Sequence, residues 1–122
     1  MKIEPEHRRR IGDYFAHFRE YKAGVAAGEQ FIRIRRHGGK KEERLEITDT
    51  DKRWLEVIEQ DIRKFDGTPK QQLLYKRFVR NENEVKISRD LYIDRSTFYL
   101  WQHEIYEYAY MLAVSKQLLR VE

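Results

Sequence analysis

The sequence contains no cysteine and only two prolines among its 122 residues. Without cysteine the chain cannot form a disulfide or a thiolate metal site, so a reducing compartment is its natural setting. It also lacks an apolar run near the ~18 residues that a membrane span needs, and no signal-peptide core follows Met1. These absences predict a cytoplasmic protein without a membrane partner.

Residue patterns typical of catalytic and metal sites are missing as well. The four histidines, at positions 7, 17, 37 and 103, have no metal-ligand spacing between them. The segment HGGKK (residues 37–41) lacks the frame of a phosphate-binding loop, and we interpret it as a hinge. Glu56, Glu59 and Asp61 share one expected helix, and we interpret them as a solvent-facing set. No nucleophile has an evident base beside it, so we expect no enzymatic activity, no cofactor and no metal.

Charge is abundant but unevenly distributed. Residues 1–45 contain 12 Lys and Arg against 7 Asp and Glu, whereas residues 46–67 sum to −3 and residues 68–122 to +2. Clustered Lys and Arg attract phosphate whatever the base sequence, so the first third is either a surface for a polyanion or a solvated helix face. The basic residues expected to attract phosphate are Arg8, Arg9, Arg10, Arg33, Arg35, Arg36, Lys40 and Lys41.

Apolar residues recur at helical spacing along most of the chain, which predicts an all-α fold. We expect a basic N-terminal helical arm over residues 1–45 and a helical domain over residues 46–122. Residues 31–47 alternate as a strand would, but with no second strong strand to pair with we interpret them as a frayed helix end. Gly24 and Gly28 either weaken the first helical segment or mark a close approach to a neighbouring element.

The stretch LYIDRSTFYLW (residues 91–101) predicts a helix-turn-helix over about residues 85–105. Asp94 is a suitable N-cap, Ile93 fits between the two helices, and Phe98 and Trp101 are expected to face the core. Donors at the start of a helix can reach base edges in a major groove. A capped helical hairpin without a ligand is the alternative. The expected DNA contacts are Arg95, Ser96, Thr97, Tyr99, Gln102 and His103.

Residues 88–109 resemble the C-terminal helix-turn-helix of phage late-gene transcriptional activators of the RinA/ArpU type, itself similar to region 4 of sigma-70-type factors. Two features depart from the pattern: Glu84 stands where an apolar residue is preferred, and residues 100–110 contain two acids but no Lys or Arg. The positions that match are Leu74, Tyr75, Phe78, Ile87, Leu91, Tyr92, Ile93, Asp94, Arg95, Ser96, Thr97, Phe98 and Tyr99.

The resemblance implies a DNA-binding regulator, an activator of phage late genes, in the bacterial host cytoplasm. Its implied partners are double-stranded DNA and RNA polymerase. Two alternatives stay open: a small terminase-type packaging subunit that forms a ring-shaped homo-oligomer, and a helical adaptor that binds protein through aromatic stripes. The tyrosines at positions 99, 106, 108 and 110 form either a stacking platform for single-stranded nucleic acid or the edge of the core.

Overall fold

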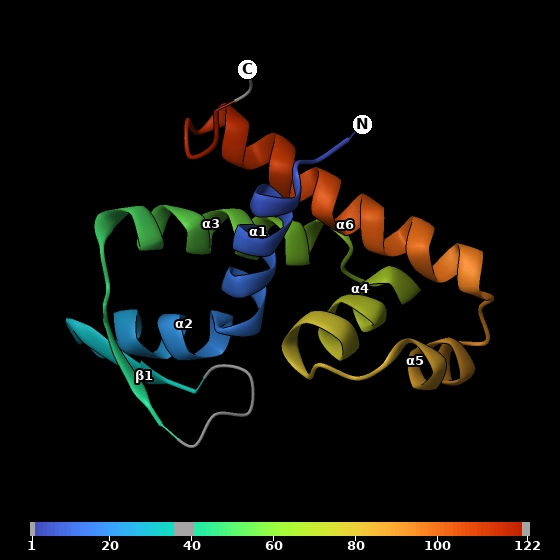
Figure 1. The fold of residues 1–122 in the computed structure, drawn as a ribbon, viewed down its shortest axis with the longest axis horizontal. Helices are drawn as coiled ribbons and strands as arrows, with labels where there is room; N and C mark the ends of the chain where they lie inside the picture. Colours follow the sequence, from blue (N-terminus) through green and yellow to red (C-terminus); the bar gives the residue numbers. More distant parts are fainter. Residues whose placement is uncertain (1, 36–40, 121–122) are drawn as a thin grey trace.

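The computed structural model describes residues 2–35 and 41–120, and most of them are helical (Figure 1). The prediction of a helical fold is therefore confirmed in outline. The hinge interpreted at residues 37–41 lies largely outside the described residues. The helices are α1 (Pro5–Ala16), α2 (Phe18–Ala26), α3 (Asp49–Lys64), α4 (Pro69–Leu74), the π-helical turn η1 (Tyr75–Val79), α5 (Glu84–Leu91) and α6 (Arg95–Ser115).

A two-stranded antiparallel hairpin separates the first two helices from the rest. Strand β1 (Phe31–Ile34) pairs with β2 (Glu43–Glu46), so interpreting residues 31–47 as a frayed helix end was wrong. Ile32 and Ile34 are buried on one side of the hairpin, which packs on α2. A Cβ on Gly24 of α2 would lie 2.7 Å from Cγ2 of Ile32, which confirms the close approach expected at this glycine.

The hydrophobic core is a single cluster to which both ends of the chain contribute. Ile11 and Phe15 of α1 are fully buried, and they belong to the same cluster as Trp54 of α3 and Phe98 of α6. The boundary predicted at residue 45 falls inside β2. The segment predicted as an arm therefore contains elements that cover the core.

Helix α6 is the longest element and packs on α1, α3, α4 and α5. Tyr110 is buried. Tyr106 lies edge-on to Phe78 with ring centres 5.0 Å apart, and Tyr108 lies edge-on to Phe65 with ring centres 6.3 Å apart. These contacts favour the core-edge interpretation of the three tyrosines. Only Tyr99 of the set has an exposed ring, at 44%.

Asp61 corrects the expectation that the acids of α3 face water. It is fully buried, and neither of its carboxylate oxygens has a hydrogen-bond partner among the described residues. The reason is helical spacing: Asp61 follows Val57 by four residues and precedes Phe65 by four, so it lies on the apolar stripe. Burial raises the pKa of this carboxyl to about 8.

Candidate functional site

Helices α5 and α6 are joined by the three-residue α5–α6 turn, Tyr92 to Asp94. Tyr92 takes a left-handed conformation with φ 55° and ψ 43°, which ends α5 and redirects the chain. The amide of Ile93 then donates to the carbonyl of Ser88 at 3.0 Å, and the Ile93 side chain packs against the core. Figure 1 shows this turn at the right-hand edge of the molecule, where α6 begins.

Asp94 caps α6, as the sequence predicts. Its Oδ1 accepts from the backbone amide of Thr97 at 2.7 Å and from the hydroxyl of Ser96 at 2.9 Å. These hydrogen bonds hold the pKa of the Asp94 carboxyl below its usual range. The first turn of α6 is thus stabilised from within the turn, and its outer side stays accessible.

Glu84, in the first turn of α5, interacts with two of the residues that were expected to contact DNA, Arg95 and Tyr99. Nε of Arg95 lies 3.2 Å from Oε1 of Glu84, and the Tyr99 hydroxyl donates to Oε2 of Glu84 at 2.6 Å. The Arg95 guanidinium carbon is also 5.6 Å from the centre of the Tyr99 ring. The sequence analysis noted Glu84 only as a departure from a pattern, because the contact spans 11 and 15 positions in the chain.

The other expected contacts on α6 are less accessible. Thr97 is half-buried, and Gln102 accepts from Nε of Arg77 at 3.3 Å. His103 lies 3.2 Å from Glu107 and its side chain is 33% exposed. Of the six residues, only Arg95, Ser96 and Tyr99 are exposed. The sequence analysis did not include Lys86 and Arg89 among the candidate DNA contacts. Both are exposed on neighbouring α5, and their spacing of three residues places them on the same face of that helix.

The expected phosphate-attracting residues do not form one cluster. On α1, Arg9 and Arg10 are exposed, and Arg10 lies 5.3 Å from the centre of the Trp54 ring, whereas Arg8 is half-buried and lies 4.5 Å from the centre of the Tyr106 ring. Arg33, Arg35 and Lys41 are exposed around the hairpin, which Figure 1 places on the opposite side of the molecule from α5. Arg36 and Lys40 lie outside the described residues.

The surroundings of the α5–α6 turn are close to neutral. Residues 82–97 contain three Lys and Arg and four Asp and Glu. Several of these charged residues form ion pairs with each other or with Lys76. Nζ of Lys86 lies 2.7 Å from Oε1 of Glu82, and Nζ of Lys76 lies 3.3 Å from Oδ2 of Asp90. The net charge of this segment, −1, therefore provides no overall attraction for phosphate.

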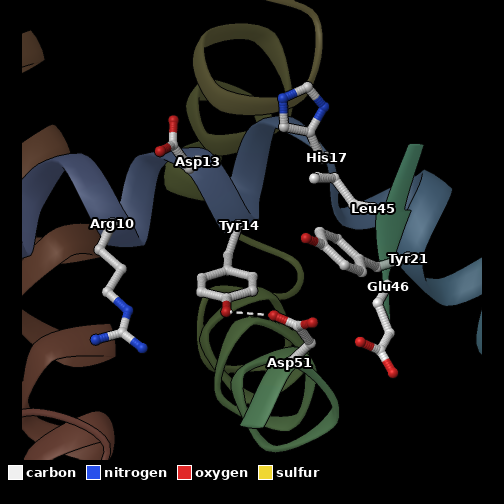
Figure 2. Close-up of a pocket in the computed structure, with 8 residues that line it drawn as sticks. All are labelled: Arg10, Asp13, Tyr14, His17, Tyr21, Leu45, Glu46 and Asp51. Atoms are coloured by element: carbon white, nitrogen blue, oxygen red, sulfur yellow. Dashed lines mark hydrogen bonds between the residues drawn. The ribbon is translucent and has the colours of Figure 1, made fainter. Parts of the chain in front are cut away.

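A separate polar pocket of about 320 Å³ lies between α1, α2, β2 and α3 (Figure 2). Inside it the Tyr14 hydroxyl donates to Oδ1 of Asp51 at 2.6 Å, and Oδ2 of Asp51 accepts from the amide of Thr48 at 2.8 Å. Burial, and then the bond to Asp51, raise the pKa of the Tyr14 hydroxyl. The residues lining the pocket are Arg10, Asp13, Tyr14, His17, Tyr21, Leu45, Glu46 and Asp51.

The buried part of this pocket is a structural joint. Thr48 and Asp51 form a reciprocal capping box at the start of α3, and the Tyr14 ring stacks on Trp54 with centres 5.0 Å apart. Asp51 thus ties α1 to α3. Within the described ranges no group of three or more His, Asp or Glu could hold a metal ion.

Comparison with protein-family models, curated proteins and solved structures finds no match for the chain. None of the helices in the described ranges is long and apolar enough to cross a membrane. The functional assignment therefore depends on the geometry of the α5–α6 turn.

Proposed function

We propose that the chain is a DNA-binding transcriptional regulator that reads base edges in the major groove with the first two turns of α6. The observation that carries this proposal is the exposed start of α6. Asp94 caps the helix, and the Arg95 side chain, 78% exposed, projects from its first residue together with Ser96 and Tyr99. A helix that enters a groove by its N-terminal end presents its first residues to the bases.

The chemistry of the three exposed side chains suits this role. An arginine can donate two parallel hydrogen bonds to O6 and N7 of guanine. The Ser96 hydroxyl, which already donates to Asp94, can accept from an exocyclic amine. The Tyr99 ring offers an apolar edge to a thymine methyl group. Unpaired backbone amides of the first turn of α6 also favour a nearby phosphate.

Phosphate contacts outside the turn would come from two neighbouring helices. Lys86 and Arg89 are exposed on α5, and Arg9 is exposed on α1, which packs on α6. Strand β1, which contains Arg33 and is followed by Arg35, lies on the other side of the molecule in Figure 1. These two arginines would engage a separate stretch of DNA or a different polyanion. The resemblance to phage late-gene activators extends the proposal to activation of late promoters.

A second candidate function is contact with a protein such as RNA polymerase. Three large apolar side chains close to the turn are exposed: Val85 at 75%, Tyr92 at 95% and Leu100 at 57%. An exposed apolar patch is typical of a protein contact, and these three side chains would contribute to one. An activator that binds DNA and polymerase together would use both surfaces. Rings of many copies in a solution mass measurement would instead favour the packaging-subunit alternative.

The test begins with selection of preferred duplexes from a random-sequence library with the purified protein. Arg95→Ala should then weaken binding to the preferred duplex by about tenfold to a hundredfold, the usual worth of a bidentate arginine–guanine contact. Binding to a shuffled duplex should weaken by a smaller factor, because it loses only one positive charge, and the melting temperature should stay the same because the side chain is exposed. Arg19→Ala, an exposed arginine on α2, is the matched control.

Two outcomes would contradict the proposal. One is a wild-type protein without preference for any duplex over its shuffled version. The other is an Arg95→Ala variant that binds the preferred duplex as tightly as the wild type does.

A further inference from the structure

From α5, Glu84 contacts two of the three exposed side chains at the start of α6, Arg95 and Tyr99. Its carboxylate bonds Nε of Arg95 with one oxygen and the Tyr99 hydroxyl with the other, at 3.2 and 2.6 Å. The Glu84 side chain is 24% exposed, whereas that of Arg95 is 78% exposed. The carboxylate therefore lies beneath the arginine, on the protein side of the contact.

A ligand can use the donors of Arg95 that Glu84 and the Tyr99 hydroxyl do not engage. A guanidinium has five N–H donors, and the one on Nε is directed to Glu84. The two terminal nitrogens carry the other four, and they form one of the edges that can bind two acceptors at once. Because Tyr99 is held by the same carboxylate, the guanidinium and the ring are fixed relative to each other.

The negative charge of Glu84 has a second effect. A phosphate that approaches Arg95 must compete with a carboxylate already paired to it, and the two anions repel. A guanine edge is uncharged and presents two acceptors at a fixed spacing, so it suffers less from this repulsion. The Glu84–Arg95 pair should therefore weaken contacts between Arg95 and DNA phosphates more than contacts between Arg95 and the correct base.

We propose that Glu84 is a specificity-determining positioning residue, which aligns Arg95 and Tyr99 for base contact and suppresses binding to non-cognate DNA. This inference rests on the proposed function. It assigns a role to a residue that the recognition-helix pattern does not include, since Glu84 belongs to α5 and not to α6.

The experiment measures dissociation constants for the selected duplex and for its shuffled version. Glu84→Ala should tighten binding to the shuffled duplex by about threefold to tenfold, the effect of one net charge near phosphates at moderate salt. The ratio of selected to shuffled affinity should fall by a similar factor. Glu84→Gln removes the same charge but keeps an acceptor for Arg95 and Tyr99, so it should reduce the ratio less.

Two further variants separate positioning from charge. Tyr99→Phe removes the hydroxyl that donates to Glu84 and leaves every charge in place. It should lower the ratio without tightening binding to the shuffled duplex. In an Arg95→Ala background, Glu84→Ala should lower the ratio by a smaller factor, because only the alignment of Tyr99 is left to lose. Glu20→Ala, an exposed acid on α2 on the far side of the molecule, is the control and should leave the ratio unchanged.

Three results would overturn the inference. If Glu84→Ala tightens binding to both duplexes equally, the residue contributes only charge. If it lowers the ratio by the same factor without Arg95, it does not act through that arginine. If the wild-type protein binds neither duplex, or binds both alike, the proposed function fails and the inference fails with it. Melting temperatures measured on every variant identify any loss that comes from unfolding.

Discussion

Helices α3 and α6 begin in the same way but in different surroundings. Thr48 accepts from the amide of Asp51 at 3.0 Å at the start of α3, and Asp94 accepts from the amide of Thr97 at 2.7 Å at the start of α6. Around α3 the cap is covered: Asp51 is 8% exposed and receives the Tyr14 hydroxyl. Around α6 the cap is exposed: Asp94, Arg95 and Ser96 are all exposed, and α5 contacts this end of α6 through Glu84.

The difference shows what a capped helix start can be used for. At α3 the polar groups of the cap are consumed by the fold, since they join α1 to α3 and leave little for a ligand. At α6 the Asp94 carboxylate binds the amide of Thr97 and the hydroxyl of Ser96 within the same turn, so the exposed side chains of that turn remain accessible to a ligand. The same local motif is a structural joint in one place and a candidate binding surface in the other.

The largest expected effect is a loss of stability, and it tests whether only one face of α6 is packed against the core. Phe98 is 1% exposed, and Phe98→Ala should lower the free energy of unfolding by about 3–5 kcal/mol because it leaves a cavity in the core. Leu100, two residues later and 57% exposed, is the control, and its change to Ala should have a much smaller effect. Chemical denaturation measures both. Equal losses would mean that the outer side of α6 is as tightly packed as the inner side.

The next effect concerns the interior of α3. Because burial raises the pKa of Asp61 to about 8 from an ordinary value near 4, the folded state binds a proton more tightly than the unfolded state between those values. The free energy of unfolding should therefore decrease as pH rises from about 4 to about 8, by about 1 kcal/mol per pH unit. Asp61→Asn should remove this dependence. Denaturation curves for both proteins at several pH values check it, and parallel pH profiles would contradict it.

The smallest effect compares the two caps directly. Asp51→Ala should cost about 2–3 kcal/mol of stability, because the reciprocal half of the capping box is lost and both the Tyr14 hydroxyl and the Thr48 amide lose a buried acceptor. Asp94→Ala should lower the melting temperature less, since water can reach the amides it exposes. Tyr14→Phe combined with Asp51→Ala should cost little more than Asp51→Ala alone. If both alanine variants melt alike, the two caps are equivalent and the comparison fails.

Several elements could be predicted because their signals are local. Asp94 precedes the Arg95–Ser96–Thr97 turn, and Thr68 precedes Pro69, so both helix starts are encoded within four residues. The apolar stripe from Trp54 to Phe65 likewise predicts α3. Asp61 was also within reach, because its position on that stripe follows from helical spacing alone.

Other elements could not be predicted because they depend on partners distant in sequence. Strand β1 is stable only beside β2, and its buried face needs the space that Gly24 leaves on α2. The pairing of Glu84 with Arg95 and Tyr99 requires the α5–α6 turn to bring two helices together. Neither juxtaposition is a property of any short window of residues.

The sequence by itself determined where most helices begin and which of their faces are apolar, because capping and periodicity act over one or two turns. Only the tertiary structure decided which helix starts are covered and which are accessible. That depends on the packing of elements far apart in the chain: Tyr14 of α1 covers the start of α3, whereas Asp94, Arg95 and Ser96 at the start of α6 are exposed. The candidate DNA surface exists because the start of α6 is exposed, whereas the start of α3 is covered.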